Sequence, residues 1–113
     1  MHAFDILGDP VRRRILEILA DKDAPSSGEI VEIIAAEFGI SQSAVSQHLK
    51  LLRDNGFASV ASVGTRRHYR LQTEPLEEVE SWLSQFRIFW APKFEALSTE
   101  IERGKRNRRN DTF

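Results

Sequence analysis

The chain has 113 residues, 41% of them hydrophobic and 29% charged, and a formal net charge of −1, which is the composition of one folded domain with a modest core. It contains no cysteine, which excludes disulfides, thiolate metal sites and thiol-based redox sensing. No apolar run approaches the length that spans a bilayer, and Asp5 and Asp9 interrupt the segment where a signal peptide would be apolar. The composition therefore favours a cytoplasmic protein.

The charge is distributed unevenly along the chain. Residues 1–40 hold eight acidic and four basic side chains, and residues 76–102 hold six acidic and two basic ones. Residues 41–70 instead hold five basic side chains and one acidic one, and residues 103–109 hold five basic ones. Chance clustering is the alternative, but basic patches of this kind favour a nucleic-acid partner.

The first half of the chain begins with two predicted helices. Residues 3–7 form a short one. Asp9 followed by Pro10 is a strong start signal, because an acceptor side chain caps the helix and proline suits its first turn. Apolar residues spaced along one face continue this second helix to about Asp21. Its arginines at 12–14 are expected to form ion pairs with Asp9 and Glu17, although a phosphate contact is the alternative.

The next two helices are separated by a short turn. Ser26 with Glu29 three residues later fits a capping box, and the apolar spacing continues to Phe38. Gly39 is the expected left-handed cap of this helix, and Ser41 caps the following one. Two helices joined by about three residues that include a glycine are typical of a helix-turn-helix.

The helix over residues 41–54 has two incompatible faces. Val45, Leu49 and Leu52 form an apolar stripe that must be buried. The opposite face is formed by Ser43, Ser46, Gln47 and Lys50. Serine and glutamine side chains both donate and accept hydrogen bonds, which reading base edges in a major groove requires. A merely solvated face would carry more Glu and Lys, so this helix is predicted to recognise DNA.

Individual roles on this helix follow from residue type. Gln47 suits a bidentate contact to adenine, and Lys50 and Arg53 suit phosphates. The helix N-terminus also favours a phosphate, although Ser41 can serve simply as a cap. His48 lies between the two faces, so a DNA contact and a structural hydrogen bond to nearby backbone both remain open. The predicted DNA-binding set here is Ser41, Gln42, Ser43, Ser46, Gln47, His48, Lys50 and Arg53.

A basic hairpin is predicted directly after this helix, which ends at residues 55–56. Residues 57–63 and 66–71 read as two strands about a Gly64-Thr65 turn. Its arginines are assigned to the phosphate backbone or the adjacent minor groove, with a solubilising hairpin tip as the alternative. These arginines are Arg66, Arg67 and Arg70.

The last predicted helix, over residues 76–103, carries more apolar surface than a three-helix core and a hairpin can cover. Left exposed, such a surface requires a partner; dimer or core packing is favoured over a ligand pocket. Pro92 predicts a kink or a break near residues 88–92. The basic segment 104–113 is expected to be a disordered tail, which either adds non-specific DNA affinity or contributes nothing.

Three segments in this order resemble the ArsR/SmtB-type winged helix-turn-helix repressors. Residues 8–16 are similar to the family opening "ALADPTRRRIL", residues 41–52 to "SQSAVSQHLKVL", and residues 64–71 to the wing "GRRRYYRL". The resemblance covers roughly residues 3–90. It implies a mostly α fold with a small β-hairpin (α+β), and homodimers that bind operator DNA in bacteria.

The resemblance also implies that the first and last helices form the dimer. The residues expected in that interface are Phe4, Leu7, Val79, Trp82, Leu83, Phe86, Phe89, Trp90, Phe94 and Leu97. The metal sites of the best-known members have no counterpart, because thiolates are lacking and residues 76–102 contain no histidine. The glutamates at 77, 78 and 80 are read as serving the helix dipole and solubility. No metal or cofactor is therefore expected.

The sequence thus predicts a single domain over residues 1–103 that represses transcription as a homodimer on a palindromic, double-stranded operator. Half-sites about one helical turn apart follow from the two-fold symmetry. The alternative is a winged-helix module that binds another protein through its apolar C-terminal helix. An enzyme is disfavoured, because no nucleophile–base or acid–base constellation is suggested. No small-molecule effector is indicated.

Overall fold

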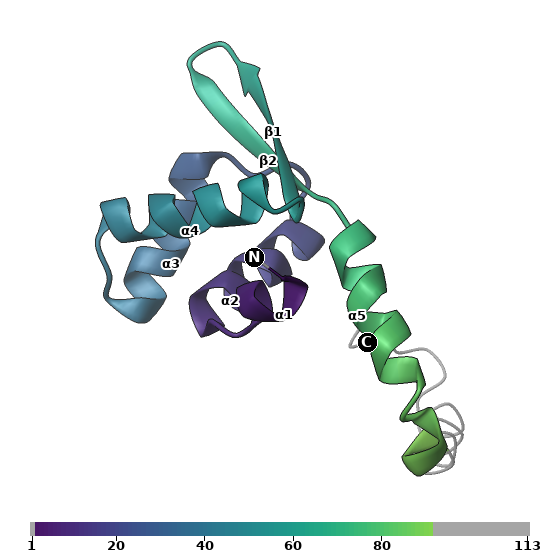
Figure 1. The fold of residues 1–113 in the computed structure, drawn as a ribbon. Helices are drawn as coiled ribbons and strands as arrows, with labels where there is room; N and C mark the ends of the chain where they lie inside the picture. The colour runs from purple at the N-terminus through teal and green to yellow at the C-terminus, as the bar shows by residue number, and fades with distance from the viewer. Residues whose placement is uncertain (1, 92–113) are drawn as a thin grey trace, which may run out of the picture. The chain divides into compact units, whose positions relative to one another are not determined.

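The computed structural model describes residues 2–91 (Figure 1), which divide into a unit that ends at Glu80 and a second unit that begins at Ser81. The elements are α1 (Ala3–Leu7), α2 (Pro10–Asp21), α3 (Ser27–Phe38), α4 (Gln42–Asp54), β1 (Ala58–Val63), β2 (Arg66–Leu71), α5 (Glu74–Ser84) and a 3-10 helix (Arg87–Phe89). This is the predicted order of helices and hairpin. Across residues 2–91, no helix combines the length and apolar character needed to cross a membrane.

Local signals place the helix ends where the sequence predicted them. The Asp9 carboxylate accepts hydrogen bonds from the backbone N–H groups of Val11 and Arg12, and Pro10 is the first residue of α2. Ser26 and Glu29 form both hydrogen bonds of the capping box, at 3.1 and 2.8 Å. Gly39 ends α3 with a φ of 66°, in the left-handed region that glycine adopts without a steric cost. These predictions are confirmed.

One hydrophobic core joins α1, α2, α3, α4 and the base of the hairpin. The predicted stripe of Val45, Leu49 and Leu52 on α4 is buried in it, and Phe57, just before β1, is only 1% exposed. Leu76 and Val79 of α5 pack against the same core. Burial of this stripe fixes the rotation of α4 about its own axis, so the opposite face must point to solvent.

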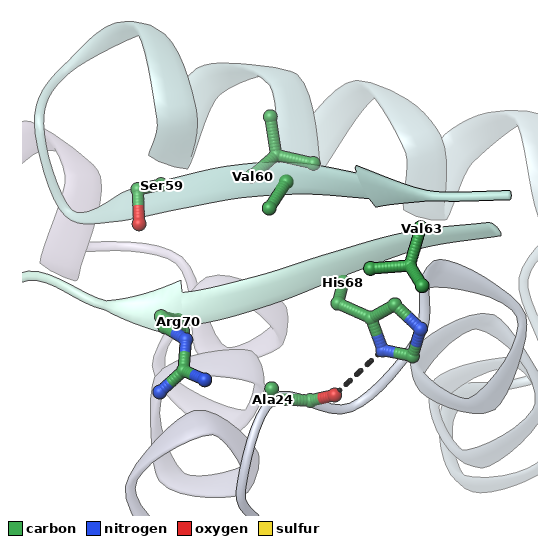
Figure 2. Close-up of a pocket in the computed structure, with 7 residues that line it drawn as sticks. Ala24, Ser59, Val60, Val63, His68 and Arg70 are labelled. Carbon is green, nitrogen blue, oxygen red and sulfur yellow. Dashed lines mark hydrogen bonds between the residues drawn. The ribbon is translucent and has the colours of Figure 1, made fainter.

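The hairpin is antiparallel, and Figure 1 shows it extending away from the helices. The turn at Gly64 has a φ of 65°. The base of β2 is tied to the loop between α2 and α3, because the Tyr69 backbone N–H donates to the Pro25 carbonyl at 3.0 Å. His68 Nδ1 lies 2.8 Å from the Ala24 carbonyl oxygen (Figure 2), so this ring anchors the hairpin.

Helix α5 ends at Ser84, before the break expected near residues 88–92. After Ser84 the backbone changes to i to i−3 hydrogen bonds, and the 3-10 helix follows. Polar side chains compete for the carbonyls at this point: Ser84 Oγ donates to Ser81 at 2.7 Å, and Gln85 Nε2 donates to Trp82 at 3.0 Å. Such competition shortens a helix without a proline. Pro92, the rest of the predicted helix to 103 and the tail lie outside the described residues.

Candidate nucleic-acid interface

The predicted DNA-facing side of α4 is exposed. Ser41 Oγ accepts a hydrogen bond from the Ala44 backbone N–H at 3.1 Å, so this side chain is a helix cap. The other exposed residues of this face are Gln42, Ser43, Ser46, Gln47 and Lys50. Arg53, in the last turn of the helix, is half-buried. The face therefore offers neutral donors and acceptors along its length and two cations toward its end.

Asp54 partly neutralises those two cations. Lys50 Nζ lies 2.6 Å from one Asp54 carboxylate oxygen, and Arg53 Nε lies 3.5 Å from the other. The hydrogen bond from Lys50 is the largest cause that lowers the pKa of Asp54. Because these pairs are solvent-exposed they are weak, and a phosphate can replace Asp54 as the partner at little cost. The face keeps a net positive charge.

The α4 face and the hairpin meet in one cleft of about 240 Å³, hereafter the helix–wing cleft. It is lined by Ser27, Ser46, Lys50, Arg53, Arg67 and Tyr69, with Leu49 beside them. The side chains come from α3, α4 and β2, so only the fold brings them together. Three cations around one small cleft provide a favourable environment for an anion.

The three wing arginines are not equivalent in the structure. Arg67 lies in the helix–wing cleft. Arg66 and Arg67 also line a shallow hollow beside the start of α3. Arg70 instead lines the hollow drawn in Figure 2, together with His68, and its guanidinium lies 3.6 Å from the Asp23 carboxylate. Alternation along β2 explains why Arg67 and Arg70, three positions apart, lie on opposite faces of the hairpin.

The arginines at 12–14 have structural partners, including the two ion pairs that the sequence predicted, Arg12 with Asp9 at 4.0 Å and Arg14 with Glu17 at 3.4 Å. Sequence reasoning missed the closer partners. Arg14 forms a bidentate pair with Glu37 of α3 at 2.8 and 3.0 Å. These contacts join residues 23 positions apart, and no local pattern signals them.

Arg12 is the buried member of this group, at 9% exposure. It donates to the carbonyl oxygens of Asp5 and Ile6 at 3.0 Å each, and its Nη1 lies 3.2 Å from His48 Nδ1. An arginine only donates, so His48 Nδ1 accepts in this contact. The structural role left open for His48 is therefore observed, with a side chain rather than the backbone as its partner.

The residues expected in a dimer interface fall into three groups. Exposed apolar side chains are Phe4 at 40%, Trp82 at 48%, Leu83 at 39% and Phe89 at 73% exposure. Leu7 and Val79 are half-buried against the core, and Phe86 and Trp90 are half-buried. The Trp82 and Phe86 rings lie 4.9 Å apart. Phe94 and Leu97 lie outside the described residues.

Within residues 2–91, the structure contains no group of three or more His, Asp or Glu side chains that could hold a metal ion. The perturbed carboxyl groups have structural causes instead. Burial raises the pKa of Asp9, but the hydrogen bonds from Val11 and Arg12 outweigh it, and the pKa is lowered. The Ser26 backbone hydrogen bond lowers the pKa of Glu29, and the hydrogen bond from Arg14 lowers that of Glu37.

These shifts predict that acid destabilises the fold. A carboxyl group whose pKa is lower in the folded chain stabilises that chain above the unfolded value and loses this effect as the pH falls. The unfolded values are 3.8 for Asp9 and 4.5 for Glu29. The melting temperature, followed by circular dichroism from pH 7 to pH 3, should therefore fall below about pH 4.5.

The Asp9→Asn variant separates charge from capping in that experiment. Asparagine still accepts the two backbone hydrogen bonds. It should be less stable than the wild type at neutral pH and should lose less stability on acidification. A wild-type melting temperature that rose as the pH was lowered from 4.5 to 3 would contradict the stabilising role of these ionised carboxyl groups.

A helix-turn-helix followed directly by a basic hairpin defines the winged helix-turn-helix class of DNA-binding proteins. Comparison with known proteins agrees: residues 7–61 match a helix-turn-helix domain family. The transcriptional repressor SdpR of Bacillus subtilis is 32% identical over 85 residues, which are 75% of this chain and 89% of that protein. The HTH-type transcriptional regulator Rv2034 of Mycobacterium tuberculosis is 36% identical over 84 residues, 74% of each chain.

The structural comparison leads to the same family. The crystal structure of an ArsR family transcriptional regulator superposes with a TM-score of 0.64 at 27% identity, over 79% of this chain and 87% of that one. The chain belongs to the ArsR-type winged helix-turn-helix transcriptional regulators. The fold and the relatives are those of DNA-binding regulators rather than enzymes.

Proposed function

We propose that this regulator is a cytoplasmic repressor that binds double-stranded operator DNA as a homodimer. The name of the B. subtilis relative, a transcriptional repressor, supports repression. A bound dimer would occlude promoter elements. Two-fold symmetry requires an imperfect palindrome with half-sites about one helical turn apart.

The observation that carries this proposal is the exposed Ser/Gln/Lys face of α4, which shares a cleft with the wing. We place α4 in the major groove and the hairpin beside the adjacent minor groove. Gln47 reads a base edge, while Lys50 and Arg53 contact phosphates together with the wing arginines Arg66 and Arg67. Ser41 and Gln42 lie at the N-terminus of α4, where backbone N–H groups favour a phosphate. Ser43 and Ser46 complete the groove-facing surface.

The dimer proposal rests on apolar exposure near the end of the described chain. Leu83, Ile88 and Phe89 are 39%, 78% and 73% exposed, close together in sequence. Solvent exposure of neighbouring large apolar side chains is unfavourable unless a partner covers them. A second copy of the chain is the partner that a palindromic operator requires.

Protection of a palindrome upstream of the regulator's own gene tests the function. Nuclease footprinting should identify a symmetric protected site, and fluorescence anisotropy should give a steep loss of affinity with rising salt, because neutralised phosphates release counterions. A flat response to every duplex at low salt, together with a stable complex with a different protein, would instead favour an interaction module.

Gln47→Ala tests the base-reading role on that site. It should lower affinity for the protected site by about fivefold and relax the preference at one base step, with non-specific binding unchanged. Gln72→Ala is the matched control, because Gln72 lies after β2 and bonds Ser59. If Gln47→Ala left the base preference intact at every position, the assignment of Gln47 would be wrong.

A further inference from the structure

We propose that the helix–wing cleft is a built site for one backbone phosphate of DNA, in which the Tyr69 hydroxyl is a hydrogen-bond donor. The inference rests on the proposed function and deepens it. It adds Tyr69 and Ser27, which residue type alone does not link to DNA. It also assigns Lys50, Arg53 and Arg67 to the same phosphate.

The Tyr69 side chain is the first observation. Tyr69 is only 4% exposed, and its ring belongs to the hydrophobic core. In the part of the chain that the structure describes, its hydroxyl has no hydrogen-bond partner. Every buried side-chain nitrogen or oxygen atom there does have a partner, so the hydroxyl must be the solvent-accessible end of the residue. Tyr69 lines the helix–wing cleft, so its hydroxyl faces that cleft without a partner among the described residues and is open to a ligand.

The charge around that hydroxyl is the second observation. Lys50, Arg53 and Arg67 line the same cleft. Asp54 can neutralise only part of the charge of Lys50 and Arg53. The three side chains come from two elements, α4 and β2, which the core holds together at Leu49, Leu52 and Tyr69. An anion is the ligand that this combination of cations and a free hydroxyl donor selects.

The start of α3 contributes further donors. Ser27 is the first residue of α3 and lines the cleft. Ser26 caps the helix by accepting from the Glu29 N–H, which leaves the N–H groups of Ser27 and Gly28 without an intrahelical acceptor. The helix macrodipole adds a positive potential at the same end. A phosphodiester fits this site because its two non-bridging oxygens, which share one negative charge, can accept hydrogen bonds from donors on three sides.

Tyr69→Phe tests the site, because it removes one oxygen atom and keeps the buried ring. The hydroxyl bonds no described residue, so the melting temperature should stay unchanged. Affinity for duplex DNA should fall about fivefold, for cognate and non-cognate sequences alike. Ser59→Ala is the matched control, since it removes a hydroxyl that lines the Figure 2 hollow instead, and it should leave the affinity unchanged.

A methylphosphonate scan of the protected duplex locates the phosphate. Neutralising the phosphate in the cleft should weaken the wild type strongly and Tyr69→Phe much less, whereas losses at the other phosphates should be equal in the two proteins. The inference would be overturned if the loss of affinity from each methylphosphonate and the loss from Tyr69→Phe were additive at every phosphate. It would also be overturned if Tyr69→Phe bound DNA like the wild type. If the wild type itself bound no duplex, the proposed function would fail instead. Inorganic phosphate is a second probe of the cleft. If it displaces DNA only at concentrations above those at which chloride does so, the site needs a phosphate that belongs to the DNA backbone.

Discussion

Phe89→Asp should convert the proposed dimer into a monomer and lower its affinity for the proposed palindromic operator by about a hundredfold or more. Phe89 is 73% exposed, so an aspartate there disturbs no buried packing within the described chain. In a dimer interface the same carboxylate would be buried against apolar side chains, which is strongly unfavourable. The mass in solution, from light scattering after gel filtration, measures the assembly directly.

The DNA measurements separate lost assembly from lost recognition. A monomer keeps its α4 face and its wing, so its affinity for a single half-site should equal that of a wild-type protomer. Only the gain from simultaneous binding of two half-sites should disappear. Val63→Asp, at a wing residue of 63% exposure, is the control for mass and should remain dimeric. A monomeric wild type, or a dimeric Phe89→Asp, would contradict the proposed interface.

Arg67→Ala should weaken binding to all duplexes alike, by more than about tenfold near 0.1 M salt. Arg67 lines the helix–wing cleft beside Lys50 and Arg53, where the cationic potential is concentrated. Loss of one phosphate contact should also reduce the slope of log affinity against log salt by about one. The preference among bases should stay the same, because phosphate contacts carry no sequence information.

Arg70→Ala is the matched control for that experiment. It removes the same charge from the same strand, but Arg70 lies on the opposite face of the hairpin and pairs with Asp23 at 3.6 Å. Its effect on affinity and on the salt slope should be smaller than that of Arg67→Ala. Equal effects would mean that the wing contributes only its total charge, and that the position of Arg67 in the cleft has no role.

The helix ends were predictable because each depends on residues only two or three positions apart. Asp9 caps α2 two residues ahead, the Ser26–Glu29 pair spans three, and Gly39 needs only its own backbone conformation. The end of α5 was not placed correctly in this way. Pro92 was the strongest breaking signal in that segment, but Ser84 and Gln85 end the helix sooner through bonds to carbonyls three residues back.

The polar face of α4 was predictable from the sequence, but the helix–wing cleft, with Ser27 and Tyr69 in its lining, was not. The polar face of α4 follows from its buried stripe, since a helix that buries Val45 and Leu49 must expose Ser46 and Lys50. By contrast, the partner of His48 is Arg12, 36 residues earlier, and His68 meets Ala24, 44 residues earlier. No residue near either histidine in the sequence indicates which partner it will have.

The sequence by itself determined the order of the helices and strands, the ends of α2 and α3, the buried face of α4, and that a helix-turn-helix precedes a basic hairpin. These properties depend on periodicity and capping, which act over one or two turns of chain. Only the tertiary structure decided that Arg67, rather than Arg70, shares a cleft with Lys50, and that Tyr69 lines the same cleft. The reason is that core packing sets how β2 lies against α3 and α4, and strand alternation then chooses which arginine faces the helix.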